Sequence, residues 1–126
     1  MQLLTPHEHA IDDQPAAVLQ VANDADLQAL SLEGVRRIDL QFPKFSDGRA
    51  FSQAVTLRRR LGFRGELRAT GDVLVDQLVQ MQRSGFDSAV LRADQDHGVA
   101  ERQLTRFGAF YQGDERNPSP HFRRAA

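Results

Sequence analysis

The chain has 126 residues, of which 40% are hydrophobic and 26% are charged. This size and composition suit one domain with a buried core and argue against disorder throughout. Cysteine is absent, which excludes disulfides, thiolate metal sites, cysteine-ligated haem or iron–sulfur clusters, and a cysteine nucleophile. No hydrophobic run approaches the roughly 20 residues that span a bilayer, and residues 1–9 lack the pattern of a signal peptide. We therefore expect a soluble cytoplasmic protein without membrane contact.

The net charge of −1 hides an uneven distribution of charged residues. Residues 1–33 contain six acidic residues and no Lys or Arg, so they carry −6. The other 16 bases and 11 acids give residues 34–126 a charge of +5. The basic residues do not form a stripe interleaved with aromatic residues, the pattern typical of nucleic-acid-binding surfaces, so we do not expect a nucleic acid as partner.

The hydrophobic pattern divides the chain into three parts. Residues 1–15 show no sustained period, and we expect them to form a flexible arm. Residues 16–113 are expected to fold as a single α/β domain, and residues 114–126 to form a flexible tail.

Strands and helices alternate within the expected domain. The expected strands cover residues 17–22, 36–42, 66–70 and 88–93. Helices are expected around Leu27 and Leu30, over residues 50–61, from Leu74 to Met81 and along the stripe Ala100, Leu104, Phe107 and Tyr111. The expected N-caps are Asn23 or Asp24, Asp72, and Asp94 or Asp96, and the expected C-terminal glycines are Gly62, Gly85 and Gly113.

This βαβαβαβα order predicts parallel strands joined by right-handed crossovers. Buried parallel strands are normally hydrophobic on both faces, but two of these strands have one polar face, which carries Arg37, Asp39, Gln41, Glu66, Arg68 and Thr70. We therefore expect four βα units with helices mostly on one face of the sheet, resembling a partial β/α barrel. The other face must meet solvent, a ligand or another subunit. Four units are about half of a complete barrel, so a homo-oligomer is expected.

Ligands of parallel α/β sheets gather at the carboxyl ends of the strands. There, Lys44 and Arg49 flank Asp47 and Gly48, and the following helix offers its first backbone amides to an anion. The alternative is an ordinary turn in which Asp47 caps the helix and Arg49 is a surface residue. The next loop adds Gly71 and Asp72.

The polar face offers a second group of candidates. Arg68, together with Arg37, suits two-point contacts to an oxyanion. The alternative is a set of ion pairs across the two strands, Arg68 with Asp39 and Arg37 with Glu66, which needs no ligand.

Other charged residues are assigned simpler roles. Asp76 falls in the first turn of its helix, where an acid favours the helix dipole, although we keep it among the candidate ligand residues. The three arginines at residues 58–60 are expected to form a solvated helix face. His7 and His9 have no third ligand nearby, and no cofactor fingerprint occurs, so we expect neither a metal nor a cofactor.

Residues 38–49, with the sequence IDLQFPKFSDGR, residues 57–78 and residues 83–87 resemble the bacterial family called domain of unknown function 934. The resemblance covers residues 35–112. Members often carry the label of an oxidoreductase of sulfite reduction, because their genes commonly neighbour those for sulfite reductase and sulfate assimilation. The positions that match the family signature are Phe42, Pro43, Asp47, Gly48, Arg49, Arg68, Gly71, Asp72, Asp76 and Gln77.

The resemblance implies a role in assimilatory sulfur metabolism. Many relatives have cysteine where this chain has Ser84, so thiol chemistry is not the essential activity of this protein. We expect an accessory or binding protein of sulfite reduction. It would bind a small oxyanion or a partner such as sulfite reductase or another sulfur-assimilation protein.

Two alternatives remain open. One is a small enzyme that acts on an anionic metabolite and joins Asp47, Arg49, Arg68 and Asp72 in one site. The other is a structural oligomer subunit that buries its polar face against a second subunit. The sequence leaves open whether the protein is an enzyme.

Overall fold

The computed structural model describes residues 1–11 and 17–108, so the expected tail over residues 114–126, Tyr111 and Gly113 lie outside the described residues. In chain order the elements are β1 (Gln2–Leu4), α1 (Pro6–Ile11), β2 (Val18–Val21), the 3-10 helix η2 (Leu27–Ala29), β3 (Arg37–Phe42), α2 (Arg49–Arg59), β4 (Glu66–Gly71), the 3-10 helix η3 (Val75–Gln77), α3 (Leu78–Ser84), β5 (Ser88–Val90) and α4 (His97–Gly108). They form a mixed α/β fold, as predicted.

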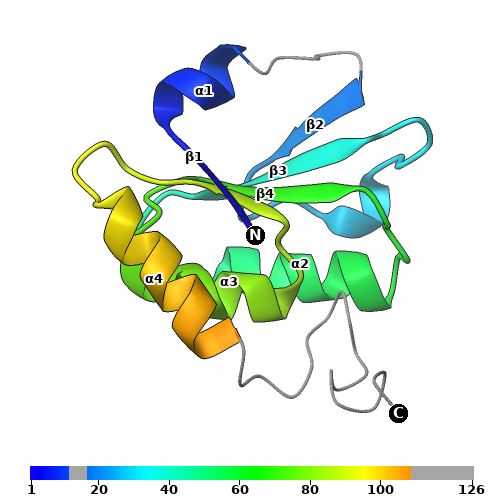
Figure 1. Cartoon of the computed structure of the whole chain (residues 1–126). Helices are drawn as coiled ribbons and strands as arrows, with labels where there is room; N and C mark the ends of the chain where they lie inside the picture. Colours follow the sequence, from blue (N-terminus) through cyan, green and yellow to red (C-terminus); the bar gives the residue numbers. More distant parts are fainter. Residues whose placement is uncertain (12–16, 109–126) are drawn as a thin grey trace.

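The described strands form one five-stranded parallel sheet in the order β1-β5-β4-β3-β2. Helices α2, α3 and α4 lie on one face of the sheet, here called the covered face, and α1 lies on the opposite side (Figure 1). The prediction of helices mostly on one face is therefore confirmed. We call the opposite side the open face; it carries the side chains of Arg37, Asp39, Glu66 and Arg68.

Alternation along the strands places the hydrophobic core on the covered face. Ile38, Leu40 and Phe42 of β3 are completely buried there. They pack in one cluster with side chains that include Ala54 and Leu57 of α2. Full burial of a side chain such as leucine or phenylalanine contributes about 1.5–3 kcal/mol, so this cluster is the main support of the sheet.

Regular structure at the N-terminus differs from the arm expected over residues 1–15. β1 pairs in parallel with β5, with Leu3 opposite Ala89. Thr5 and Glu8 then form a capping box, in which each residue's backbone amide donates to the other's side chain, at 2.9 and 3.0 Å. The strand was missed because three residues are too few to show a period and its partner is more than 80 residues away in the chain. α1 was missed because it has no buried residue and hence no hydrophobic stripe.

Some of the predicted caps are confirmed and others are wrong. Asp96, one of the two expected caps of α4, accepts hydrogen bonds from the amides of Gly98 and Val99. Asp72 caps no helix and bonds the Phe45 amide instead. Asp26, not Asn23 or Asp24, caps η2. Gly85 ends α3 with a φ of 110°, as a C-terminal glycine should.

Arg58 is the clearest correction among the basic residues. It was expected on a solvated face, but its side chain is fully buried on the covered face. Its guanidinium donates to the carbonyl oxygens of Phe63, Gly65 and Gly85, and to the Asp87 carboxylate at 2.6 Å. Arg58 thus ties α2 to the segments that lead into β4 and β5.

Candidate ligand site on the open sheet face

The open face carries a grid of charged side chains from β3 and β4. The strand register places Arg37 beside Glu66 and Asp39 beside Arg68, as the sequence predicted. Among the described residues, however, the ion pairs run along each strand rather than across it. Arg37 Nε lies 2.8 Å from Asp39 Oδ1, and Arg68 Nη2 lies 2.8 Å from Glu66 Oε2. Residues two apart on one strand face the same side, so these pairs form without any change of register.

This grid is buried and closely hydrogen-bonded. Arg68 is 1% exposed and Asp39 is 3% exposed. Ser88 of β5, also buried, accepts a hydrogen bond from Arg68 Nε at 3.0 Å and donates one to Glu66 Oε2 at 2.5 Å. Buried charges are costly unless they are paired and hydrogen-bonded. The ion pairs and hydrogen bonds within the grid therefore hold its side chains in place. We call this grid the floor of the open face.

His9 of α1 lies against this floor. Its Nδ1 is 3.1 Å from Arg68 Nη1. A guanidinium can only donate, so this contact is a hydrogen bond when Nδ1 accepts, which requires the neutral tautomer with its proton on Nε2. Nε2 in turn lies 3.9 Å from Asp39 Oδ2. These contacts favour that tautomer and hold the ring of a histidine that is 24% exposed.

Beside His9 the open face is hollowed, with a cavity volume of about 320 Å³. We call this cavity the open-face hollow; its lining residues are His9, Gln20, Val21, Ala22, Asp39, Gln41 and Thr70. They come from α1, from three strands and from the end of β2. Gln20 and Gln41 are exposed, and their side-chain amides make no hydrogen bond within the described part of the chain. The hollow therefore joins a fixed histidine and a buried carboxylate to two amides that are available to a ligand.

The loops at the carboxyl ends of the strands are built differently. Arg49 is mainly exposed, and its guanidinium and backbone amide both bond Asp47. These hydrogen bonds lower the pKa of Asp47 to about 2. Asn23 also donates to the Asp47 carboxylate, at 2.6 Å. The Asp47 carboxylate and the Arg49 guanidinium therefore bond each other and stabilise the turn between β3 and α2.

The neighbouring loops contain a second exposed network. Asp72 accepts from the Phe45 amide at 2.7 Å and pairs with Arg92 at 2.6 Å. Arg92 also pairs with Asp94. The hydrogen bonds from Arg92 and Phe45 hold the pKa of Asp72 below its ordinary value. Gln77 bonds the Phe45 carbonyl oxygen, which fixes this loop further.

The residues singled out from the sequence therefore fall into two groups. Seven lie at the carboxyl ends of the strands, namely Lys44, Asp47, Gly48, Arg49, Gly71, Asp72 and Asp76. Arg68 lies on the open face, where its partners are Glu66, Ser88 and His9. Arg49 and Arg68 thus belong to separate networks.

Sequence reasoning missed several residues of the hollow. Gln41 and Thr70 were recognised as polar-face residues but not as site residues, and His9 was considered only as a metal ligand. The Thr5–Glu8 capping box is the local sign that could have placed His9 on a helix. Nothing local indicates that this helix lies over β3 and β4.

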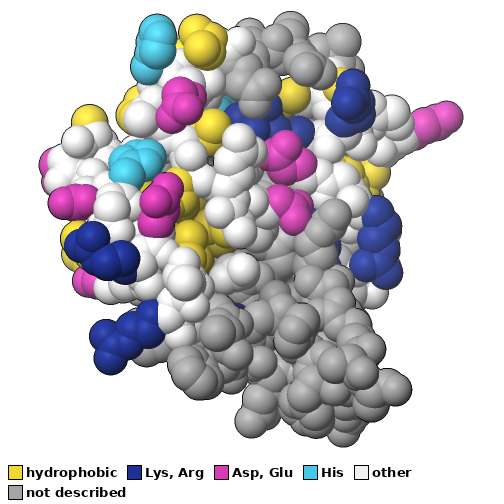
Figure 2. Space-filling model, in the orientation of Figure 1, with side chains coloured by type: hydrophobic (Ala, Val, Ile, Leu, Met, Phe, Trp, Pro, Cys, Tyr) yellow, Lys and Arg dark blue, Asp and Glu magenta, His cyan; other side chains and the backbone are white. Residues whose placement is uncertain are grey.

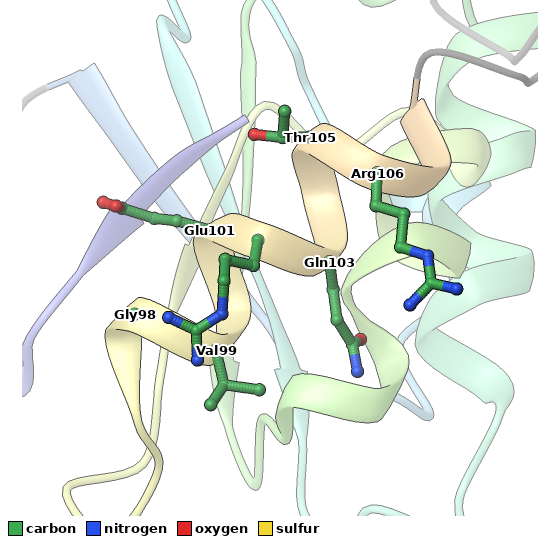
Figure 3. Close-up of a pocket in the computed structure, with 7 residues that line it drawn as sticks. Gly98, Val99, Glu101, Gln103, Thr105 and Arg106 are labelled. Carbon is green, nitrogen blue, oxygen red and sulfur yellow. The ribbon is translucent and has the colours of Figure 1, made fainter.

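A larger hollow, of about 880 Å³, follows α4. Its described lining residues all belong to that one helix, and their side chains point in different directions (Figure 3). Glu101 and Arg106, for example, extend to opposite sides of the helix (Figure 3). Within the described part of the chain, this hollow therefore does not bring polar groups from separate elements together around one point.

On the side of the molecule shown in Figure 2, acidic and basic side chains are interspersed. Among residues 1–11 and 17–108, no group of three or more His, Asp or Glu side chains is placed to hold a metal ion. The helices of this part of the chain are all too short or too polar to cross a membrane.

The model of a family described as bacterial protein of unknown function (DUF934) matches residues 17–122. The chain belongs to this family. The resemblance drawn from residues 35–112 is thus confirmed. The match begins at the residue before β2, so it includes Gln20, Asp39, Gln41 and Thr70 but leaves out His9. No curated protein and no solved structure matches the chain.

Proposed function

We propose that this DUF934 protein is a binding protein of assimilatory sulfur metabolism that holds a small polar ligand in the open-face hollow. The hollow itself carries the proposal, because it joins polar side chains from four elements on a floor made rigid by buried ion pairs. Its volume of about 320 Å³ lies at the lower end of the range for small-molecule sites. The metabolic setting rests on the sulfite-reduction role that the family resemblance implies.

Preorganisation supports binding at this place. The Arg68 network holds His9 and Glu66, and Arg37 holds Asp39, before any ligand arrives. A ligand therefore does not have to order the floor, which lowers the cost of binding. The free amides of Gln20 and Gln41 then supply both donors and acceptors.

The loops at the carboxyl ends support a ligand less well. The guanidinium of Arg49 already bonds Asp47, and Arg92 already bonds Asp72 and Asp94. An enzyme site that combines Arg49 and Arg68 has no geometric support, since the two side chains belong to different networks. We therefore place the ligand on the open face.

Binding can be tested on the full chain by titration calorimetry and by amide chemical shifts, with sulfite, sulfate, thiosulfate and small sulfur-containing metabolites as probes. We expect saturable binding by at least one probe, with shifts concentrated around Gln20, Asp39, Gln41 and Thr70. Shifts confined to residues 43–49 and 71–76 would place the site at the strand ends and overturn the proposal.

A pair of matched variants sharpens this test. Gln41→Leu removes one amide of the hollow and should weaken binding roughly five- to tenfold, as expected for one lost hydrogen bond. Gln80→Leu makes the same change at an exposed position of α3, on the covered side, and should leave the affinity unchanged. Equal affinities in the two variants would remove Gln41 from the site.

A further inference from the structure

We infer that the ligand of the open-face hollow belongs to the class of small zwitterions, such as free α-amino acids, rather than to the multiply charged oxyanions. This inference rests on the proposed function and names the chemistry of its ligand. It follows from where the formal charges of the open face lie and from which groups still have hydrogen-bonding capacity.

The charge of the hollow disfavours a dianion. Asp39 is the only one of the described lining residues that carries a formal charge when His9 is neutral. The guanidiniums of Arg37 and Arg68 lie outside the lining and form two-point contacts to Asp39 and Glu66. A doubly charged oxyanion in the hollow would therefore meet the Asp39 carboxylate, while the neighbouring guanidiniums of Arg37 and Arg68 already bond Asp39 and Glu66.

Asp39 is instead placed to receive an ammonium group. Each of its carboxylate oxygens accepts a hydrogen bond from Arg37, at 2.8 and 3.2 Å. A carboxylate oxygen has two lone pairs, so each retains capacity for another donor. A charge-assisted bond from an ammonium group is stronger than a neutral one, particularly beside a side chain that is 3% exposed.

The rest of the lining suits a carboxylate that carries a single charge. The exposed side-chain amides of Gln20 and Gln41 offer N–H donors to it. These donors are neutral, so they satisfy a carboxylate without the large desolvation cost of a further buried ion pair. The amides of Gln20 and Gln41 would therefore bind the carboxylate of the ligand, and Asp39 would bind its ammonium group.

The test compares zwitterions with molecules that carry only one of the two charges, using the wild-type chain. The zwitterions are L-serine and L-cysteine, the amine is ethanolamine and the carboxylate is lactate. The other probes are the neutral polyol glycerol and the oxyanions sulfite and sulfate. We expect at least one amino acid to bind roughly tenfold or more tightly than every other probe, because only the zwitterion uses both sides of the hollow. Amide shifts at Gln20, Asp39 and Gln41 should report its binding.

Variants then assign the two ends of the ligand. Asp39→Asn should weaken the amino acid strongly but should not weaken lactate, because the anion then no longer meets a carboxylate. Gln41→Leu should weaken both. If Asp39→Asn does not fold, the wild-type probe series decides by itself.

The outcomes separate the inference from the proposed function. Sulfite, sulfate or glycerol could bind more tightly than either amino acid, with amide shifts at the hollow. That result would overturn the inference that the ligand is a zwitterion but would keep the proposed binding function. If no probe in either series produced shifts at the hollow, both would fall.

Discussion

Two buried arginines mark opposite sides of the sheet and show how differently the two sides are built. On the covered face, Arg58 bonds three backbone carbonyl oxygens and the Asp87 carboxylate. On the open face, Arg68 contacts the side chains of Glu66, Ser88 and His9. The partners of Arg58 thus belong largely to the backbone of the fold, whereas those of Arg68 are side chains that form the floor of the open-face hollow.

The two arginines therefore have different consequences for stability and function. The Asp87 carboxylate that holds Arg58 also accepts from the Leu67 amide at 3.0 Å, so this network continues into β4. Gly85 packs directly against the Arg58 side chain, leaving no room for a Cβ. The Arg68 network instead includes His9, which lines the open-face hollow. The covered face carries the core of the fold, and the open face combines buried ion pairs with an accessible hollow.

The largest effect is expected from Arg58→Leu. It leaves several carbonyl oxygens and the Asp87 carboxylate without their donor, and loss of one member of a buried charge network typically costs about 3–5 kcal/mol. Urea unfolding should show this loss of stability. Arg60→Leu, at an exposed position two residues away, should change stability by less than about 0.5 kcal/mol. Similar values for both variants would contradict the structural role of Arg58.

A smaller effect on stability is expected from Arg68→Met, about 1–2 kcal/mol by urea unfolding. Glu66 is one-third exposed, so water can solvate its carboxylate when the guanidinium is lost. The same variant releases Nδ1 of His9, so the imidazole nitrogen shifts should lose the signature of a single tautomer. A loss as large as that of Arg58→Leu, with an unchanged His9 spectrum, would show that the two faces are alike.

The smallest effect concerns the exposed loops. The pKa of Asp72 is lowered in the folded protein by Arg92, so this carboxylate stabilises the fold above its unfolded pKa. That contribution is lost as the pH falls from about 4 through the folded pKa. Arg92→Gln should therefore lose less stability than the wild type between about pH 6 and pH 3, as measured by urea unfolding. An equal loss in both proteins would remove the Arg92 pair from the acid response.

Much of the architecture followed from local sequence patterns. Alternation along residues 36–42 and 66–70 predicted the strands, their polar face and the neighbouring positions of Asp39 and Arg68. The four-residue spacing of Ala50 and Ala54 predicted α2 and its buried face. These features are local because a strand repeats every two residues and a helix every 3.6, so a short window reveals which face is hydrophobic.

The candidate site was only half visible in the sequence. The polar face was recognised, but the loops around Asp47 and Asp72 were ranked above it because parallel sheets usually bind ligands at their carboxyl ends. In the folded chain the arginines of those loops form ion pairs with the loops' own aspartates. Whether an arginine is free or already paired depends on side-chain contacts, which composition and spacing do not determine.

By itself, the sequence determined a parallel α/β domain with one polar sheet face and membership of the DUF934 family. Only the tertiary structure decided that β1 joins β5, that Arg58 is buried and that His9 meets Arg68 across 59 positions of the chain. The physical reason is the range of the interactions. Periodicity records what a residue does within one helix or strand, whereas the hollow exists because packing brings α1 to strands far from it in sequence.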